Sequence, residues 1–297
     1  MDLRVLRYFL AVAKEGSISG AAESLYVTQP TLSRQLMDLE EELGAKLLVR
    51  GGRKLTLTEK GMFFRKRAQE IVDLADRTRR EFRAPDEIVS GDIHIGGGEM
   101  NGMRLIANVA VKFQNRYPHV RYHFFSGSAD DVMERLDKGL LDFGVLIEPG
   151  RVDRYERIKL PATEIWGVLM RKDSPLAARE TITSEDLRDA PLLVSRRPPV
   201  QNEISRWMGR NIESLDIKAT YNLIYNAAIM VEKGMGYALC LYRLVNVTGD
   251  CCLCFRPLRP RLESSLDVVW KKYQVFSKAA EKFLMSLQEE LSSPSAS

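Results

Sequence analysis

The sequence predicts an α/β protein in which a small helical N-terminal region is joined by one long helix to a larger region of alternating strands and helices. Two observations carry this prediction. Apolar residues recur at three- and four-residue spacing through residues 1–85, and from Ser90 onward short apolar runs alternate with helical periods. The length of 297 residues also exceeds that of one ordinary core. Several domains are therefore expected.

Composition excludes several classes of protein. Hydrophobic residues make up 45% and charged residues 28%, as in globular proteins. No apolar run approaches the roughly 20 residues of a membrane span, and the N-terminus does not resemble a signal peptide. We therefore expect a cytoplasmic location and no membrane partner.

The four cysteines, Cys240, Cys251, Cys252 and Cys254, lack the spacing of a disulfide framework or a zinc site. A structural or incidental role is expected, with redox or metal sensing as the alternative, and no cofactor.

Three short helices are predicted at the N-terminus. The first runs from about Leu3 to Lys14 and ends at Gly16, and the second follows Ser17 or Ser19. The third follows Thr28, with a proline in its first turn, where a missing N–H costs nothing. The positions at its start that lie outside the apolar stripe form a candidate set for base and phosphate contacts in a helix-turn-helix: Gln29, Pro30, Thr31, Ser33 and Arg34. The alternative is an ordinary three-helix bundle in which these residues are only caps.

A basic hairpin is predicted directly after the third helix. Residues 47–49 and 55–57 form two short strands, and the turn between them contains Arg50, Arg53 and Lys54. Between Lys46 and Arg67 there are eight basic residues and one acidic residue. Such a wing after a recognition helix can reach a minor groove or its phosphates. The order of helix, turn, helix and wing favours a winged helix-turn-helix that binds double-stranded DNA.

A long helix begins near Thr58 and ends before Pro85. Apolar or small residues alternate at spacings of four and three along one seam: Phe64, Ala68, Ile71, Ala75, Thr78 and Phe82. This pattern predicts pairing with a second copy of the chain, and packing on the chain's own C-terminal region is the alternative. We expect a winged helix-turn-helix over residues 1–58 and a dimerisation helix over residues 59–88.

Residues 1–60 resemble the DNA-binding domain of LysR-type transcriptional regulators. The resemblance lies in the runs at Leu6–Phe9, Gly16–Ser17, Ala21–Ala22, Thr28–Leu36, Leu39–Gly44 and Leu57–Gly61. It implies that Gln29, Pro30, Ser33 and Arg34 face the groove and that Arg50 and Arg53 are wing contacts. It also implies an effector-controlled regulator that forms a dimer or a tetramer, with RNA polymerase as a further candidate partner.

Residues 89–297 are expected to form a two-lobed α/β effector domain, similar in layout to periplasmic binding proteins. Strands and helices alternate twice, and crossovers are expected near 161–163 and 264–265. Lobe I is assigned to residues 89–161 and 266–297, and lobe II to residues 162–265. Two such lobes predict a ligand cleft between them.

Helix starts after strands nominate the residues of this cleft, because their backbone N–H groups bind anions. The candidates are Gly98, Glu99, Met100, Asn101, Ser126, Ser128, Ser195, Asn222 and Asn226. Each is alternatively only a helix cap. Glu99 departs from the family pattern, which has Ser or Thr here. Its carboxylate would repel an anionic effector and suit a cation or a polyol, unless it faces solvent and pairs with Arg104.

Catalysis is not expected, because the sequence contains no nucleophile elbow, Walker loop, zincin motif or complete dinucleotide fingerprint. A solute-binding or sensor protein without a DNA role is the alternative to a regulator, but it leaves the first ninety residues unexplained. The favoured mechanism couples ligand binding in the cleft to the spacing of paired winged domains and the bend of the DNA.

Overall fold

The computed structural model describes residues 1–49, 55–81, 88–147 and 153–292. The chain divides into two compact units, Met1–Pro85 and Asp86–Ser297. The candidate wing contacts Arg50, Arg53 and Lys54 and the last seam residue, Phe82, lie outside the described residues.

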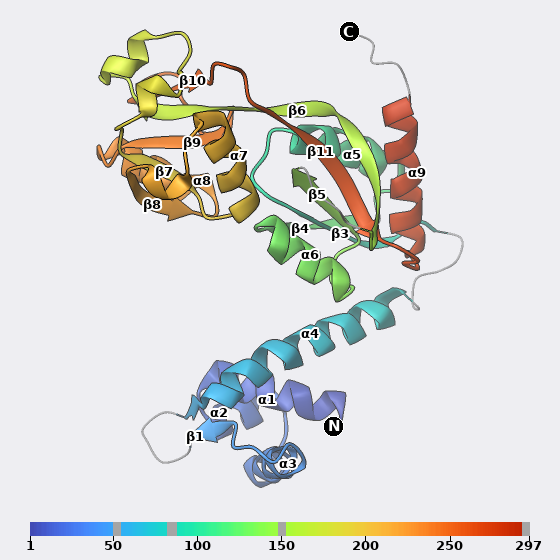
Figure 1. Cartoon of the computed structure of the whole chain (residues 1–297). Helices are drawn as coiled ribbons and strands as arrows, with labels where there is room; N and C mark the ends of the chain where they lie inside the picture. Colours follow the sequence, from blue (N-terminus) through green and yellow to red (C-terminus); the bar gives the residue numbers. More distant parts are fainter. Residues whose placement is uncertain (50–54, 82–87, 148–152, 293–297) are drawn as a thin grey trace. The chain divides into compact units, whose positions relative to one another are not determined.

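The first unit is mainly helical, as expected (Figure 1). Its elements are α1 (Leu3–Glu15), α2 (Ile18–Ser24), α3 (Gln29–Glu42), β1 (Leu48–Val49), β2 (Thr56–Leu57) and α4 (Glu59–Glu81). Ser17 caps α2, since its side chain accepts a hydrogen bond from the N–H of Gly20. The two short strands pair antiparallel.

The core of this unit lies between α1, α3 and α4. Leu6, Phe9 and Leu32 are fully buried. Phe9 meets Phe64 of α4 edge to face, with ring centroids 5.0 Å apart. An ion pair between Arg7 and Asp76 also joins α1 to α4. The first half of α4 is therefore part of the core of its own unit.

Two side chains organise the base of the predicted wing. The buried carboxylate of Glu40 accepts hydrogen bonds from the backbone N–H groups of Leu47 and Leu48. Thr58 donates to the carbonyl of Lys46 at 2.7 Å. At Gly61 only glycine fits, because a Cβ there would lie 2.0 Å from the carbonyl oxygen of Leu47. These contacts explain the short run Leu57–Gly61 in physical terms.

The second unit contains most of the strands. Its named strands are β3 (Gly91–Gly97), β4 (Val120–Ser126), β5 (Phe143–Ile147), β6 (Tyr155–Arg171), β7 (Leu192–Ser195), β8 (Ile217–Tyr221), β9 (Tyr237–Leu241), β10 (Leu253–Pro257) and β11 (Glu263–Lys271). Its α-helices are α5 (Met103–Arg116), α6 (Ala129–Asp137), α7 (Pro198–Met208), α8 (Ile224–Glu232) and α9 (Lys278–Ser292). Three short 3₁₀ helices are η1 (Pro175–Ala178), η2 (Glu185–Leu187) and η3 (Ile212–Ser214).

In the described residues these strands form one mixed sheet, with the order β4-β3-β5-β11-β6-β9-β7-β8 and β10 paired to β6. The pairs β3–β4, β3–β5, β7–β8 and β7–β9 are parallel, as the alternating pattern predicts. The strands β6 and β11 are antiparallel to their neighbours.

The two expected crossovers are a pair of long strands. β6 has 17 residues and continues through Pro161–Thr163, where a crossover had been expected. Its partner β11 shifts register between Ser265 and Asp267. Pro161 lies in the stretch of β6 that has no β11 partner, which suits a residue with no N–H to donate. The indole N–H of Trp166 donates to Ser264 Oγ at 3.0 Å and ties the two strands together.

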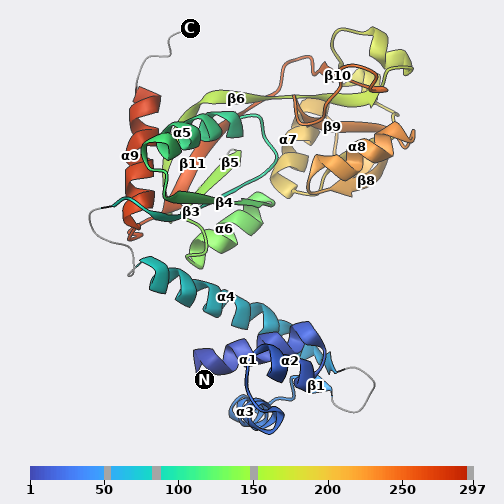
Figure 2. The same cartoon turned by 180° about the vertical axis from the view of Figure 1, so that it is seen from behind.

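Helices cover both faces of the sheet in each lobe. In lobe I, α5 and α9 pack together on one core cluster, and α6 packs on another (Figures 1 and 2). In lobe II, α7 belongs to one cluster and α8 to a second. The starts of α6, α7 and α8 supply residues to the site described below.

Candidate functional site

The first candidate site is the exposed side of α3. Gln29, Pro30, Thr31 and Arg34 are exposed and Ser33 is half-buried, whereas Leu32, Leu36 and Leu39 are buried. The amphipathic division expected from the sequence is therefore present. The structure brings this candidate set onto the first turns of one helix, from which side chains can enter a major groove.

The start of α3 differs from an ordinary capped helix. Thr28 is the N-cap, but its side chain makes no capping hydrogen bond. Its hydroxyl instead lies 2.8 Å from that of Thr31. The first backbone N–H groups of α3 therefore receive no bond from the N-cap side chain, which leaves them free for a phosphate oxygen.

Sequence reasoning missed Tyr26, which precedes α3. Its side chain is 96% exposed, and its backbone has a φ of 56°. A tyrosine that is fully exposed at positive φ beside α3 is a candidate phosphate contact. No signal of spacing or composition marked it, since the exposure follows from the turn between α2 and α3.

The predicted seam residues of α4 have different surroundings. Phe64 and Ala68 pack on the core of their own unit, whereas Ile71 and Thr78 are exposed and Ala75 is half-buried. Other apolar side chains of α4 that the seam did not include are exposed, namely Met62, Phe63 and Leu74. The exposed apolar surface of α4 thus includes neighbours of the predicted seam.

The second candidate site is a pocket between the two lobes of the second unit. It has about 630 Å³ of empty volume, including the part open to solvent. Six of the nine predicted effector residues line it: Gly98, Glu99, Met100, Ser128, Ser195 and Asn222. Asn101, Ser126 and Asn226 are not among its lining residues. Most of the remaining wall is apolar.

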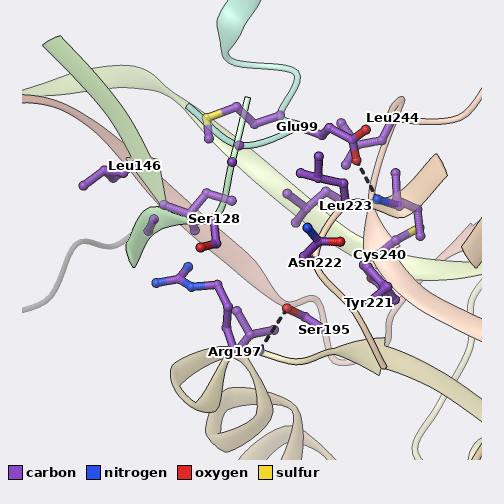
Figure 3. A pocket seen from close by; sticks show the side chains of 18 of the residues that line it. Glu99, Ser128, Leu146, Ser195, Arg197, Tyr221, Asn222, Leu223, Cys240 and Leu244 are labelled. Carbon is purple, nitrogen blue, oxygen red and sulfur yellow. Dashed lines mark hydrogen bonds between the residues drawn. The ribbon is translucent and has the colours of Figure 1, made fainter. Parts of the chain in front are cut away.

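Glu99 links the two lobes across this pocket. Its carboxylate accepts a hydrogen bond of 2.5 Å from the backbone N–H of Ile224, the first residue of α8 (Figure 3). The alternative in which Glu99 faces solvent and pairs with Arg104 is wrong, because Glu99 bonds Ile224 and Arg104 Nε donates to Asn101 Oδ1 at 2.9 Å. The carboxylate therefore occupies the positive end of a helix dipole.

Ser128 begins α6 on the lobe I side of the pocket. It forms a capping box with Asp131, whose carboxylate accepts from both the N–H and the hydroxyl of Ser128 at 2.9 and 2.6 Å. The hydrogen bond from Ser128 holds the pKa of the Asp131 carboxyl below its usual range. The start of α6 is thus closed by its own side chains.

Arg197 is a pocket residue that sequence reasoning missed. It is the N-cap of α7, and its backbone N–H donates to Ser195 Oγ at 3.3 Å (Figure 3). Its buried Nε atom has no hydrogen-bond partner within the described ranges. Because Arg197 begins a helix that follows a strand, the signal that nominated Ser195 also applied to it.

Cys240 and Tyr221 close the apolar end of the pocket. Burial raises the pKa of the Cys240 thiol to about 12, so this cysteine remains a protonated, apolar wall. The Tyr221 hydroxyl donates to the carbonyl of Leu239. Within the described residues, no group of three or more His, Cys, Asp or Glu side chains could hold a metal ion.

A helix-turn-helix unit followed by a two-lobed unit with a ligand pocket defines a DNA-binding regulator that responds to a small molecule. Residues 3–62 match the bacterial regulatory helix-turn-helix protein model of the lysR family, and residues 87–292 match the LysR substrate binding domain. The chain belongs to the LysR family of transcriptional regulators. It is a DNA-binding transcriptional regulator with a helix-turn-helix domain and an effector-binding domain.

Relatives agree with this assignment, and solved structures agree with the fold. The chain is 31% identical to the Hca operon transcriptional activator HcaR of Escherichia coli, with all of both chains covered. It is 29% identical to the E. coli regulator IlvY, with 80% of this chain and 81% of IlvY covered. The fold is similar to that of CbnR, a LysR family regulator, with a TM-score of 0.77, 20% identity and coverage of 98% and 99%. CbnR complexed with its target DNA gives a TM-score of 0.75.

In the described part of the chain, no helix is both long enough and apolar enough to cross a membrane.

Proposed function

We propose that α3 reads an operator through the side chains at its N-terminal half. The observation that carries this proposal is the division of α3: Leu32 and Leu36 are buried, while Gln29 and Arg34 are exposed. Gln pairs with adenine and Arg with guanine through two hydrogen bonds each, and Thr and Ser suit phosphates. We also propose DNA contacts for the basic side chains of the predicted wing, Arg50, Arg53 and Lys54, which lie outside the described residues.

The test is selection of DNA by the full-length protein from a random-sequence library, followed by gel shifts on the enriched fragment. We expect enrichment of an inverted repeat whose half-sites lie on one face of the duplex. A library that keeps its random composition after repeated rounds, together with binding that does not depend on sequence, would contradict the proposal.

We further propose that α4 pairs two copies of the chain. Exposed apolar side chains on one helix of a small unit favour a protein contact, and here they include Phe63, Ile71 and Leu74. The chain would then act on DNA in the cytoplasm as a dimer, or as a tetramer of two such dimers, with RNA polymerase as a further candidate partner. In sedimentation, Ile71→Asp should shift the protein toward the monomer, whereas the exposed polar substitution Lys14→Asp on α1 should not. An intact dimer in Ile71→Asp would contradict the pairing.

The interlobe pocket is the site that we propose for the effector. Six predicted residues line it, and its apolar wall with a few polar groups is typical of small-molecule sites. Ligand binding would shift the closure of the lobes, and the protein would act by this shift rather than by catalysis.

A further inference from the structure

Charge is placed unevenly in the interlobe pocket. Among the described residues, Glu99 and Arg197 are the charged side chains that line it. Asn222 lies between them in the view of Figure 3. Glu99 is engaged by the N–H of Ile224, whereas the buried Nε of Arg197 has no hydrogen-bond partner in the described residues.

The unpartnered Nε of Arg197 contrasts with three other arginines of lobe II. Arg171 pairs with Asp173, Arg179 with Asp186 and Arg188 with Glu185. Within the described ranges, no carboxylate is ion-paired with Arg197. Burying a donor without a partner costs free energy, and a guanidinium is well suited to hold a carboxylate through two parallel hydrogen bonds.

Two of the helix starts that reach the pocket, those of α6 and α8, are already occupied by carboxylates of the protein. Asp131 holds the N–H and the hydroxyl of Ser128 at the start of α6. Glu99 occupies the start of α8, where an anionic ligand would otherwise be favoured. A negative group that enters the pocket is therefore repelled at Glu99 and attracted at Arg197.

We propose that the effector is a small organic monoanion whose carboxylate binds Arg197 and whose uncharged apolar body lies along the wall toward Glu99. This wall includes Val200, Leu241 and Leu244. Glu99 acts as a specificity residue, because its carboxylate excludes a second negative charge from the far end of the ligand. The proposal rests on the pocket being the effector site and adds the charge class of the ligand.

The test measures binding of small probes to the full-length protein by calorimetry and thermal shift. The probes are the monocarboxylates butyrate, hexanoate, octanoate and benzoate, the dicarboxylate adipate, the neutral hexanamide and the cation hexylamine. At least one monocarboxylate should bind more tightly than adipate, hexanamide and hexylamine. Arg197→Met should weaken that binding roughly 10- to 100-fold, as expected for a charged hydrogen-bond pair.

Three variants keep this test selective. Arg206→Met, an exposed arginine on the same helix α7, should bind the probe as the unmodified protein does. Arg197→Lys should retain part of the binding, because it keeps the charge. Glu99→Gln should reduce the difference in binding affinity between hexanoate and adipate. The melting temperature of Arg197→Met without ligand should equal or exceed that of the unmodified protein, whereas a structural role for the guanidinium would lower it.

The outcomes separate this proposal from the proposed function. Preferential binding of hexanamide or hexylamine would overturn the monoanion and leave the effector pocket in place. Equal monocarboxylate binding by Arg197→Met and Arg206→Met would also overturn it. Absence of binding by every probe would overturn the proposal that the effector is a monoanion. The DNA selection described above would still test the proposed role as a DNA-binding regulator.

Discussion

The backbone N–H groups at the starts of α3 and α8 have opposite surroundings. The N-cap side chain of α3 makes no capping bond, and the residues that follow it are exposed. The start of α8 is closed by the carboxylate of Glu99 from the other lobe. An open helix start is available to the phosphates of a duplex, whereas a closed one transfers ligand recognition to side chains. The difference distinguishes the surface that we propose for DNA from the pocket that we propose for the effector.

The largest expected effect on stability is at the closed start. Glu99→Ala removes a charged acceptor from the N–H of Ile224 and with it a tie between the lobes. We expect the second unit to lose about 1–2 kcal/mol of unfolding free energy, since the carboxylate is half-buried. Denaturant unfolding of the full chain measures this loss. Unchanged stability, or faster amide exchange in α8 of Glu99→Gln than of Glu99→Ala, would contradict the closed start.

At the open start of α3, a substitution should raise the unfolding free energy instead of lowering it. Thr28→Asp supplies a good N-cap and an anion to α3, so the first unit should gain a few tenths of a kcal/mol. The same charge repels phosphates, and DNA affinity should fall about tenfold. Gel shifts and thermal unfolding report the two effects separately. A variant that binds DNA as tightly as the unmodified protein would show that no phosphate approaches this end of α3.

Ser128→Ala tests the capping box that closes α6. The loss of the hydroxyl should cost about 1 kcal/mol, seen as faster amide exchange in α6. The response to ligand should change, while DNA affinity without ligand should not. Loss of both would indicate a folding defect instead of a role at the pocket.

A smaller effect is expected from pH. The hydrogen bond from Ser128 lowers the pKa of Asp131 in the folded protein. A group whose pKa is lowered on folding stabilises the fold above its unfolded pKa, about 3.9 for Asp, and this contribution is lost as the pH falls through the folded value. Amide protection in α6 should therefore decrease in acid, and it should decrease less in Asp131→Asn. An equal acid response of the two proteins would contradict this assignment.

Local patterns predicted the first unit well. The cap at Ser17, the start of α3 after Thr28 and the alternation of buried and exposed residues along α3 depend on neighbours within a few positions. The parallel pairs of the second unit also followed from the alternation of strands and helices. These features were predictable because their determinants are short-range.

The features that the sequence did not reveal depend on distant contacts. The partner of Glu99 lies 125 residues further along the chain. The sequence suggested either a ligand contact or an exposed ion pair for Glu99, and neither prediction included a bond to the start of a distant helix. The seam of α4 was read from one helix, but Phe64 and Ala68 face the core of their own unit because α1 packs there. β10 was not predicted, since its pairing with β6 joins segments that are far apart in sequence.

The most direct test of the central claim, that the exposed start of α3 reads bases, is the ratio of affinities for the selected operator and a scrambled duplex at one salt concentration. Arg34→Ala should lower this ratio by a factor that corresponds to about 1–3 kcal/mol of binding free energy. Lys14→Ala on α1 should leave the ratio unchanged, although it removes the same charge. If both variants keep the ratio of the unmodified protein, or lower it equally, Arg34 does not read a base and the account of α3 is wrong.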